Sequence, residues 1–146
     1  MDLILRIIHA ITQVHPPHAL AVHFPIALTG AALFFILVAV WKRNIILEQV
    51  AFANISLAAA STIVAAMLGI RDNIVFYNGG APNHIAKIAL ASTLFIITTL
   101  TAIARWRNKE LFYSKRTKGL YVGAYFVSFG IAAVLGFLGG IITFGF

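Results

Sequence analysis

The hydropathy of the chain is organised into four long apolar segments separated by short polar ones. Each segment has the roughly 20 residues that an α-helix needs to cross the hydrocarbon core of a bilayer. Their periodicity is helical or continuous, without the ten-residue alternation typical of a transmembrane barrel. The pattern therefore predicts an all-α fold, a transmembrane four-helix bundle, because a spanning backbone must satisfy its hydrogen bonds internally. The expected spans are about 18–41, 50–70, 84–104 and 120–144.

The segment before the first span has a different pattern. Its polar residues follow the spacing i, i+4, i+7 and i+11, which places them on one face of a helix whose other faces are apolar. These residues are Asp2, Arg6, His9 and Gln13. A basic n-region and a small-residue cleavage site are missing, so a cleavable signal peptide is not expected. We predict an interfacial amphipathic segment at 1–16, equally suited to docking on a partner subunit, and a single four-span membrane domain at 17–146.

Composition supports a membrane protein and narrows its chemistry. Hydrophobic residues make up 61% of the chain and charged residues 10%, against roughly 25% charged in soluble domains. The absence of cysteine excludes thiolate ligands and thiol nucleophiles. No two of the four acidic residues are expected to share a site, and the sequence has no phosphate loop, dinucleotide fingerprint or nucleophile elbow. A stand-alone enzyme is not expected, and neither is a channel or transporter, because polar groups in the spans are few.

Basic residues are concentrated at one end of the predicted spans. Eight of the 11 Lys and Arg residues follow the first or the third span. They are Lys42, Arg43, Arg105, Arg107, Lys109, Lys115, Arg116 and Lys118. By the positive-inside rule this end is cytoplasmic, so both termini and the connection at 71–83 are expected on the periplasmic or outer side. We interpret the triplet RWR, residues 105–107, as an anchor in the headgroup zone rather than as a nucleic-acid motif.

All five histidines fall at the opposite, outer end of the predicted bundle. Three of them lie in the stretch HPPHALAVHFP, residues 15–25, and His84 opens the third span. The first two prolines of the stretch suit the turn into the first span. Pro25 lies inside that span, where it leaves the Ala21 carbonyl without its helical donor and predicts a kink beside His23.

Small residues are frequent in the second and fourth spans. The pairs Gly119/Gly123 and Gly136/Gly140 have the four-residue spacing of a close helix crossing. These features predict a compact bundle in which the second and fourth spans are the tightly packed members. At the start of the third span, Asn83 is the expected N-cap.

These motifs resemble the DUF2231 family of predicted four-span bacterial membrane proteins, over most of the chain. The stretch HALAVHFP, residues 18–25, is similar to the family's opening His-Pro-x-x-Val-His-Phe-Pro, with Ala19 in place of the first proline. The stretch GIRD, residues 69–72, is similar to its Gly-x-x-Asp exit from the second span. Asn83-His84 and the glycine-rich residues 136–140 resemble the start of its third span and part of its fourth. The resemblance implies a fold and a bacterial cytoplasmic membrane location, and it implies no activity.

The histidines suggest haem as the sharpest functional hypothesis. Neutral imidazole is a common ligand of iron, and helix bundles hold cofactors with side chains from different helices. His23 and His84, on separate spans at similar depth, are the candidate axial ligands of a b-type haem near the outer surface. Asp72 is the candidate acceptor of a hydrogen bond that orients a ligand imidazole. The chain would then be a small subunit of a redox or energy-converting complex that exchanges electrons with a periplasmic redox protein or quinol.

Two other interpretations stay open. In one, the chain binds no cofactor and is a structural or accessory subunit that contacts other membrane proteins or lipids, and its histidines bond to backbone, water or headgroups. In the other, a copper or zinc ion is held at the periplasmic face by His18, His23 and His84. His15 and His18 are expected at the wet entry to the first span, while His23 is expected inside the bundle.

Overall fold

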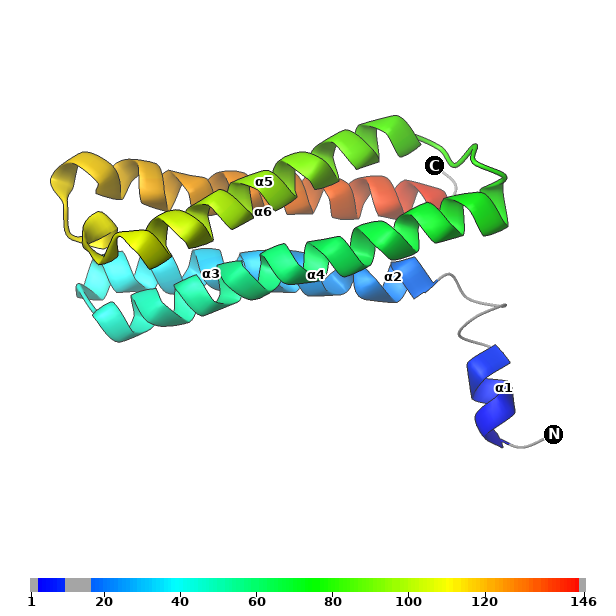
Figure 1. Ribbon diagram of the computed structural model, residues 1–146, viewed down its shortest axis with the longest axis horizontal. Coiled ribbons are helices and arrows are strands. Elements are labelled where there is room, and N and C mark those ends of the chain that lie inside the picture. The colour runs from blue at the N-terminus through cyan, green and yellow to red at the C-terminus, as the bar shows by residue number, and fades with distance from the viewer. Residues whose placement is uncertain (1–2, 10–16, 145–146) are drawn as a thin grey trace.

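The computed structural model describes residues 3–9 and 17–144, and all of its regular elements there are helices (Figure 1). A short helix comes first, four long spans follow, and a 3-10 turn precedes the last span. The elements are α1 (Leu3–His9), α2 (Pro17–Ala21), α3 (His23–Lys42), α4 (Ile45–Tyr77), α5 (His84–Arg107), η2 (Lys109–Phe112) and α6 (Lys115–Phe144). Within these described residues, four helical stretches are long and apolar enough to cross a membrane, with α2 and α3 together forming the first. The predicted four-span all-α fold is confirmed.

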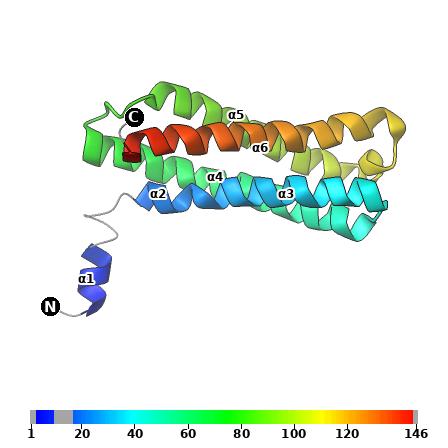
Figure 2. The ribbon, with the colours of Figure 1, turned by 180° about the vertical axis from the view of Figure 1, so that it is seen from behind.

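The four spans run alternately up and down in a closed ring (Figures 1 and 2). Each packs on its neighbours in the order α3, α4, α5, α6 and back to α3, so α4 and α6 lie diagonally opposite each other. The last part of α6, the α4–α5 connection and α2 all lie at one end. The opposite end carries the α3–α4 turn and η2. Large apolar side chains cover the outside, as in a helix bundle that faces lipid.

The observed helices extend beyond the apolar runs, because polar residues form their ends. Asn44 caps α4: its side-chain oxygen accepts hydrogen bonds from the backbone N–H of Ile46, at 2.8 Å, and of Leu47. At the far end of α4 the polar residues 71–73 remain helical, and Asn78 ends the helix in the left-handed region, with φ 48°. Hydropathy alone stops short of both ends because polar residues in caps and last turns stay helical.

The first span is interrupted beside His23, at the place where Pro25 predicts a kink. Val22 forms a turn between α2 and α3, and Pro25 is buried at the third position of α3. The backbone N–H of Val22 donates to the His18 carbonyl at 3.0 Å, which closes α2. Proline has no N–H to donate to the Ala21 carbonyl, so the helix cannot continue regularly through this point.

Small residues pack differently from the prediction. The buried face of α4 is largely alanine, and α4 makes its most extensive contact with α3. A Cβ built on Gly119 or Gly123 meets no atom within 4 Å, so this pair does not mark a close crossing, and the prediction that it does is wrong. Gly136 does lie at a close contact, since its Cβ would be 3.0 Å from the Cδ1 of Ile26 on α3. Four-residue spacing identifies a helix face, whereas the three-dimensional packing decides what covers that face.

Helix α1 lies to one side of the bundle end (Figure 1). Its Arg6 and His9 side chains are exposed. Asp2 and Gln13, the other members of the predicted polar stripe, lie outside the described residues. The division into an interfacial segment at 1–16 and a membrane domain at 17–146 stays a prediction.

Candidate functional site

His18 is anchored to α4 rather than lying free at the wet entry to the span. Its Nδ1 lies 2.8 Å from the carbonyl oxygen of Ala65. Its ring packs on Gly69, where a Cβ would come within 2.9 Å of the His18 Cε1 atom. Because only glycine leaves room for the ring, Gly69 and the Ala65 carbonyl together form the binding site of the His18 side chain on α4. His18 thus lies at the start of the first span and is bound there by α4, while His15 lies outside the described residues.

Asp72, about one turn beyond Gly69 on α4, also binds the segment around His18. Its carboxylate is 4% exposed and accepts a hydrogen bond from the backbone N–H of His18 at 3.0 Å. Its other oxygen accepts from Nη1 of Arg71 at 2.9 Å. The first N–H groups of a helix have no partner within the helix, so Asp72 caps α2 from a different span. Within the described residues its partners are a backbone N–H and a guanidinium rather than an imidazole.

The two predicted haem ligands each bond to a carbonyl of their own segment. His23 is exposed, so the expectation that it lies inside the bundle is wrong. Its Nδ1 lies 2.7 Å from the carbonyl of Ala19, across the break between α2 and α3. Nδ1 of the half-buried His84 lies 2.8 Å from the carbonyl of Ala81. The expected side-chain cap is absent, because Asn83 adopts the left-handed region with φ 56° and its side chain makes no capping bond.

The carbonyl partners decide the tautomer of these histidines. A carbonyl oxygen only accepts, so Nδ1 of His18, His23 and His84 carries the proton, and in the neutral ring Nε2 has the lone pair. This is the arrangement in which a backbone acceptor orients a metal-ligating histidine. Among the described residues, however, no three His, Cys, Asp or Glu side chains are grouped so that they could hold a metal ion.

A second polar cluster lies at the other end of the bundle, where the sequence analysis interpreted the basic residues only as indicators of membrane orientation. Glu48 on α4 is fully buried and pairs with Arg105 on α5, which is 6% exposed. The guanidinium is bidentate: Nε donates to Oε1 at 2.5 Å and Nη2 donates to Oε2 at 2.7 Å. Arg105 is therefore held inside the bundle by Glu48, and the interpretation of residues 105–107 as an exposed anchor is wrong for this residue. Trp106 and Arg107 are exposed, as an anchor requires.

Two tyrosines on α6 complete the cluster. The hydroxyl of Tyr121 donates to Glu48 Oε1 at 2.7 Å and lies 2.8 Å from the hydroxyl of Tyr125. Because the carboxylate takes the only Tyr121 proton, Tyr125 is the donor in the second bond. The rings meet edge to face, with centroids 5.2 Å apart. We call Glu48, Arg105, Tyr121 and Tyr125 the buried ionic cluster, which joins three of the four spans.

Helical phase is the signal that identifies this cluster in the sequence. The buried residues of α5 include Leu94, Thr98, Thr101 and Arg105, at spacings of four, three and four. Arg105 thus continues the inward face, while the adjacent Trp106 points outward. On α4, Glu48 and Asp72 likewise share the face of the buried alanines. The positive-inside rule counts basic residues in each connection and ignores which face of the helix they lie on, so it does not identify Arg105 as buried.

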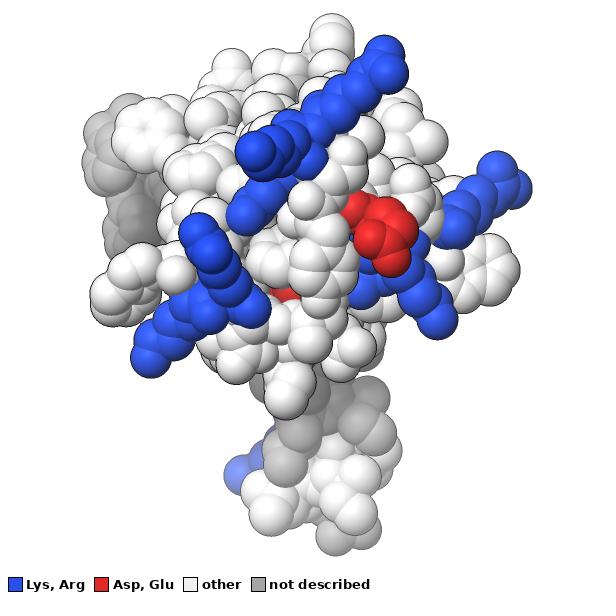
Figure 3. Space-filling model, turned by 90° about the vertical axis from the view of Figure 1, so that its left-hand side faces the viewer, with Lys and Arg blue, Asp and Glu red and all other residues white. Residues whose placement is uncertain are grey.

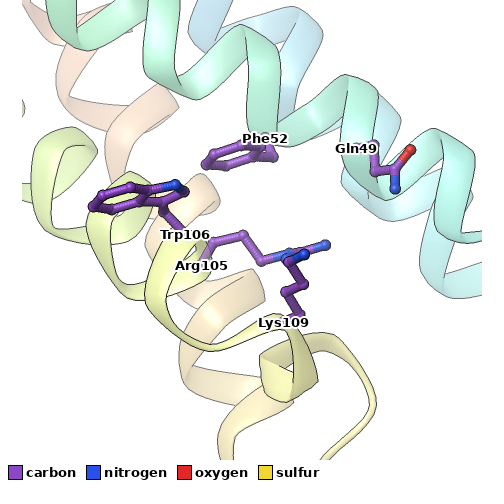
Figure 4. A pocket seen from close by; sticks show the side chains of 5 residues that line it. All are labelled: Gln49, Phe52, Arg105, Trp106 and Lys109. Atoms are coloured by element: carbon purple, nitrogen blue, oxygen red, sulfur yellow. The ribbon is translucent and has the colours of Figure 1, made fainter.

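The buried ionic cluster borders a pocket of about 340 Å³ that is lined by α4, α5 and η2 (Figure 4). The lining residues are Gln49, Phe52, Arg105, Trp106 and Lys109. The Cζ of Arg105 lies 5.8 Å from the centre of the Phe52 ring. Figure 4 shows Lys109 extending towards the Arg105 guanidinium, while Gln49 points away. Lys and Arg side chains surround this end of the molecule (Figure 3).

The comparison with known protein families agrees with this architecture. The profile of DUF2231, described as a predicted membrane protein, matches residues 14–146. The chain belongs to the DUF2231 family. No protein of curated function and no solved structure matches it.

The motifs that resemble DUF2231 meet in the fold of this member. The ring of His18, from the opening motif, rests on Gly69, and its N–H donates to Asp72, so the first two motifs are in direct contact. Gly136, from the glycine-rich motif, approaches Ile26 just after the opening motif. Three of the four segments that carry the resemblance are therefore joined by contacts in the half of the bundle that holds His18. The buried ionic cluster lies outside them.

Proposed function

We propose that this DUF2231 protein is a non-catalytic accessory subunit of a bacterial cytoplasmic-membrane assembly. The observation that carries the proposal is the pairing of its interior polar groups. Glu48 is matched by Arg105 and Tyr121, and Asp72 is matched by His18 and Arg71. Such pairing supports a rigid bundle with few interior groups left for a substrate. Its broad apolar exterior suits contact with other membrane proteins.

A b-type haem at His23 and His84 is the second candidate. It is favoured by the Nδ1 contacts, which leave Nε2 of both rings available as ligand atoms. When bound, haem would supply one-electron transfer. Because His23 is exposed, its ring is accessible from outside the bundle, and this suits a haem at the contact with a neighbouring subunit.

One preparation separates the two candidates. The protein is extracted into native nanodiscs, its mass is determined, and a reduced-minus-oxidised visible spectrum is recorded. The accessory role predicts a colourless particle containing more protein than one 15.8 kDa chain. A b-type haem band that disappears in both His23→Ala and His84→Ala would instead support the redox role and reject the cofactor-free one. A colourless monomer, with a wild-type helical circular dichroism spectrum, would reject both.

The same particle also tests whether the exposed apolar surface of the bundle binds the partner protein. Phe137→Ala removes a large apolar side chain that is 65% exposed and makes little contact within the bundle. Ala132→Leu alters a fully buried position of the same helix. If the apolar exterior of the bundle binds a partner protein, Phe137→Ala should release that partner without changing thermal stability. Ala132→Leu, in contrast, should lower thermal stability.

A further inference from the structure

The pocket beside the buried ionic cluster has the polarity of a lipid site. Its lining residues come from the start of α4, the end of α5 and η2, so the pocket lies at the end of the spans. Helix ends of a spanning bundle lie at the depth of the lipid headgroups. Phe52 and Trp106 supply its apolar walls, while Lys109 and Arg105 supply cationic groups.

Arg105 has hydrogen-bonding capacity left on the pocket side. Glu48 accepts from Nε and Nη2, but Nη1 has no hydrogen-bond partner among the described residues. Within the described residues, the fully buried side-chain N and O atoms all have a hydrogen-bond partner except Thr99 Oγ1. Since Nη1 of Arg105 has no partner and is not that exception, it retains some solvent exposure. A guanidinium that is held in place by a buried carboxylate presents its remaining N–H groups with little further loss of side-chain freedom.

The pocket also has an excess of positive charge. Glu48 neutralises Arg105, and its oxygens already accept three hydrogen bonds. Lys109 forms no ion pair within the described residues. Glu110 is next to Lys109 in the sequence, but it does not line the pocket and forms no ion pair there either. One cation next to free guanidinium N–H groups is complementary to one anionic group.

We propose that this pocket binds the phosphate headgroup of an anionic phospholipid. Lys109 and the Nη1 side of Arg105 contact the phosphate, and the upper acyl region lies against Phe52 and Trp106. The volume of about 340 Å³ falls in the lower part of the range for small-molecule sites and suits a headgroup. Basic pockets between helices on the cytoplasmic side are suited to anionic headgroups on electrostatic grounds.

The two tryptophans of the chain provide a reporter and a control. Trp106 lines the pocket, whereas Trp41 lies at the end of α3 and is not among its lining residues. Trp41→Phe therefore leaves one fluorophore in the pocket, and Trp106→Phe leaves one outside it at the same end of the bundle. The purified full chain is placed in phosphatidylcholine vesicles that contain increasing fractions of brominated phosphatidylglycerol or, in parallel, brominated phosphatidylcholine.

We expect brominated phosphatidylglycerol to quench Trp106 with an apparent affinity at least about fivefold higher than brominated phosphatidylcholine, in line with the attraction of one basic side chain for an anionic surface. Lys109→Gln should remove that preference. Lys42→Gln deletes the same charge from the same end without touching the pocket, and it should leave the preference unchanged. The exposed positions of both lysines make these variants compatible with folding.

Three outcomes would overturn the proposal. Equal quenching by the two lipids would show that the headgroup is not recognised. An equal phosphatidylglycerol preference at Trp41, or one that survives Lys109→Gln, would assign the effect to the overall charge of this end. Relief of quenching by inorganic phosphate, but not by chloride at equal ionic strength, would identify a site for free phosphate rather than for lipid. None of these outcomes depends on whether the chain has a protein partner.

Discussion

A carboxylate and a guanidinium inside an apolar bundle stabilise it only while each neutralises the other. Glu48 is fully buried and Arg105 is 6% exposed, and their bidentate contact pairs the two charges within the apolar bundle. Taking one partner away leaves an unpaired charge, whereas taking both away leaves a space that apolar side chains can fill. The pair is therefore a determinant of which helices meet, more than a large source of stability.

Replacement of the pair tests this argument. Glu48→Leu and Arg105→Met are each expected to lower the free energy of unfolding by about 3–5 kcal/mol. Each substitution leaves the charge of the remaining partner buried and unpaired. The double variant is expected to be more stable than either single variant. The measurement is unfolding in mixed micelles, followed by circular dichroism. Strictly additive losses would contradict a direct coupling between these two side chains.

The tyrosine hydroxyls should contribute unequally. Tyr121→Phe removes the donor to a charged acceptor, so we expect a loss of about 1.5–3 kcal/mol. Tyr125→Phe removes a neutral hydrogen bond and leaves the bond between Tyr121 and Glu48 intact, so we expect about 0.5–1.5 kcal/mol. The same unfolding assay measures both. Equal losses would indicate that the proton order from Tyr125 through Tyr121 to Glu48 is incorrect.

At the scale of helices, the break between α2 and α3 lets the first turns of the span be held from α4. Asp72 binds the N–H of His18, and the His18 ring binds the Ala65 carbonyl above Gly69. A five-residue helix such as α2 is too short to be stable alone, so these contacts are what keep it in place. The close approach depends on the absence of a side chain at Gly69.

Two alanine substitutions separate packing glycines from exposed ones. At Gly69 the new Cβ would overlap the His18 ring, so Gly69→Ala is expected to destabilise the protein by about 1–3 kcal/mol. At Gly123 the Cβ meets nothing within 4 Å, so Gly123→Ala should stabilise the helix by about 0.5–1 kcal/mol. Adding His18→Ala to Gly69→Ala removes the overlap, and a matching loss in both backgrounds would contradict this mechanism.

The helices themselves were predictable, because twenty-residue apolar runs leave few alternatives in a bilayer. The break beside His23 was also predictable, since Pro25 acts through the backbone of its own turn. The missing cap at Asn83 was not, because the left-handed conformation of Asn83 is set by the whole α4–α5 connection. Local rules therefore give the elements, while their ends depend on contacts made only after folding.

The same division holds for the whole molecule. Hydropathy identifies which segments span, but the ring order that places α4 diagonal to α6 comes from short connections and side-chain fit. The meeting of Glu48, Arg105 and Tyr121 follows from that order, so no single segment reveals it. The outer-end grouping of the histidines was derived from topology alone, yet the partner of each ring, a carbonyl in every case, depends on details within a few ångströms.

Orientation in the membrane is a property of the complete chain, and the absence of cysteine makes it directly measurable. Gly80→Cys places one thiol in the exposed α4–α5 connection, and Glu110→Cys places one in η2 at the other end while keeping all eight basic residues there. Because those eight charges resist translocation, we expect a membrane-impermeant maleimide to label Gly80→Cys in intact spheroplasts and Glu110→Cys only after permeabilisation. The reverse labelling would place the histidine end in the cytoplasm. It would also move the proposed phospholipid pocket to the outer leaflet, where the attraction of anionic cytoplasmic lipids no longer acts on Lys109.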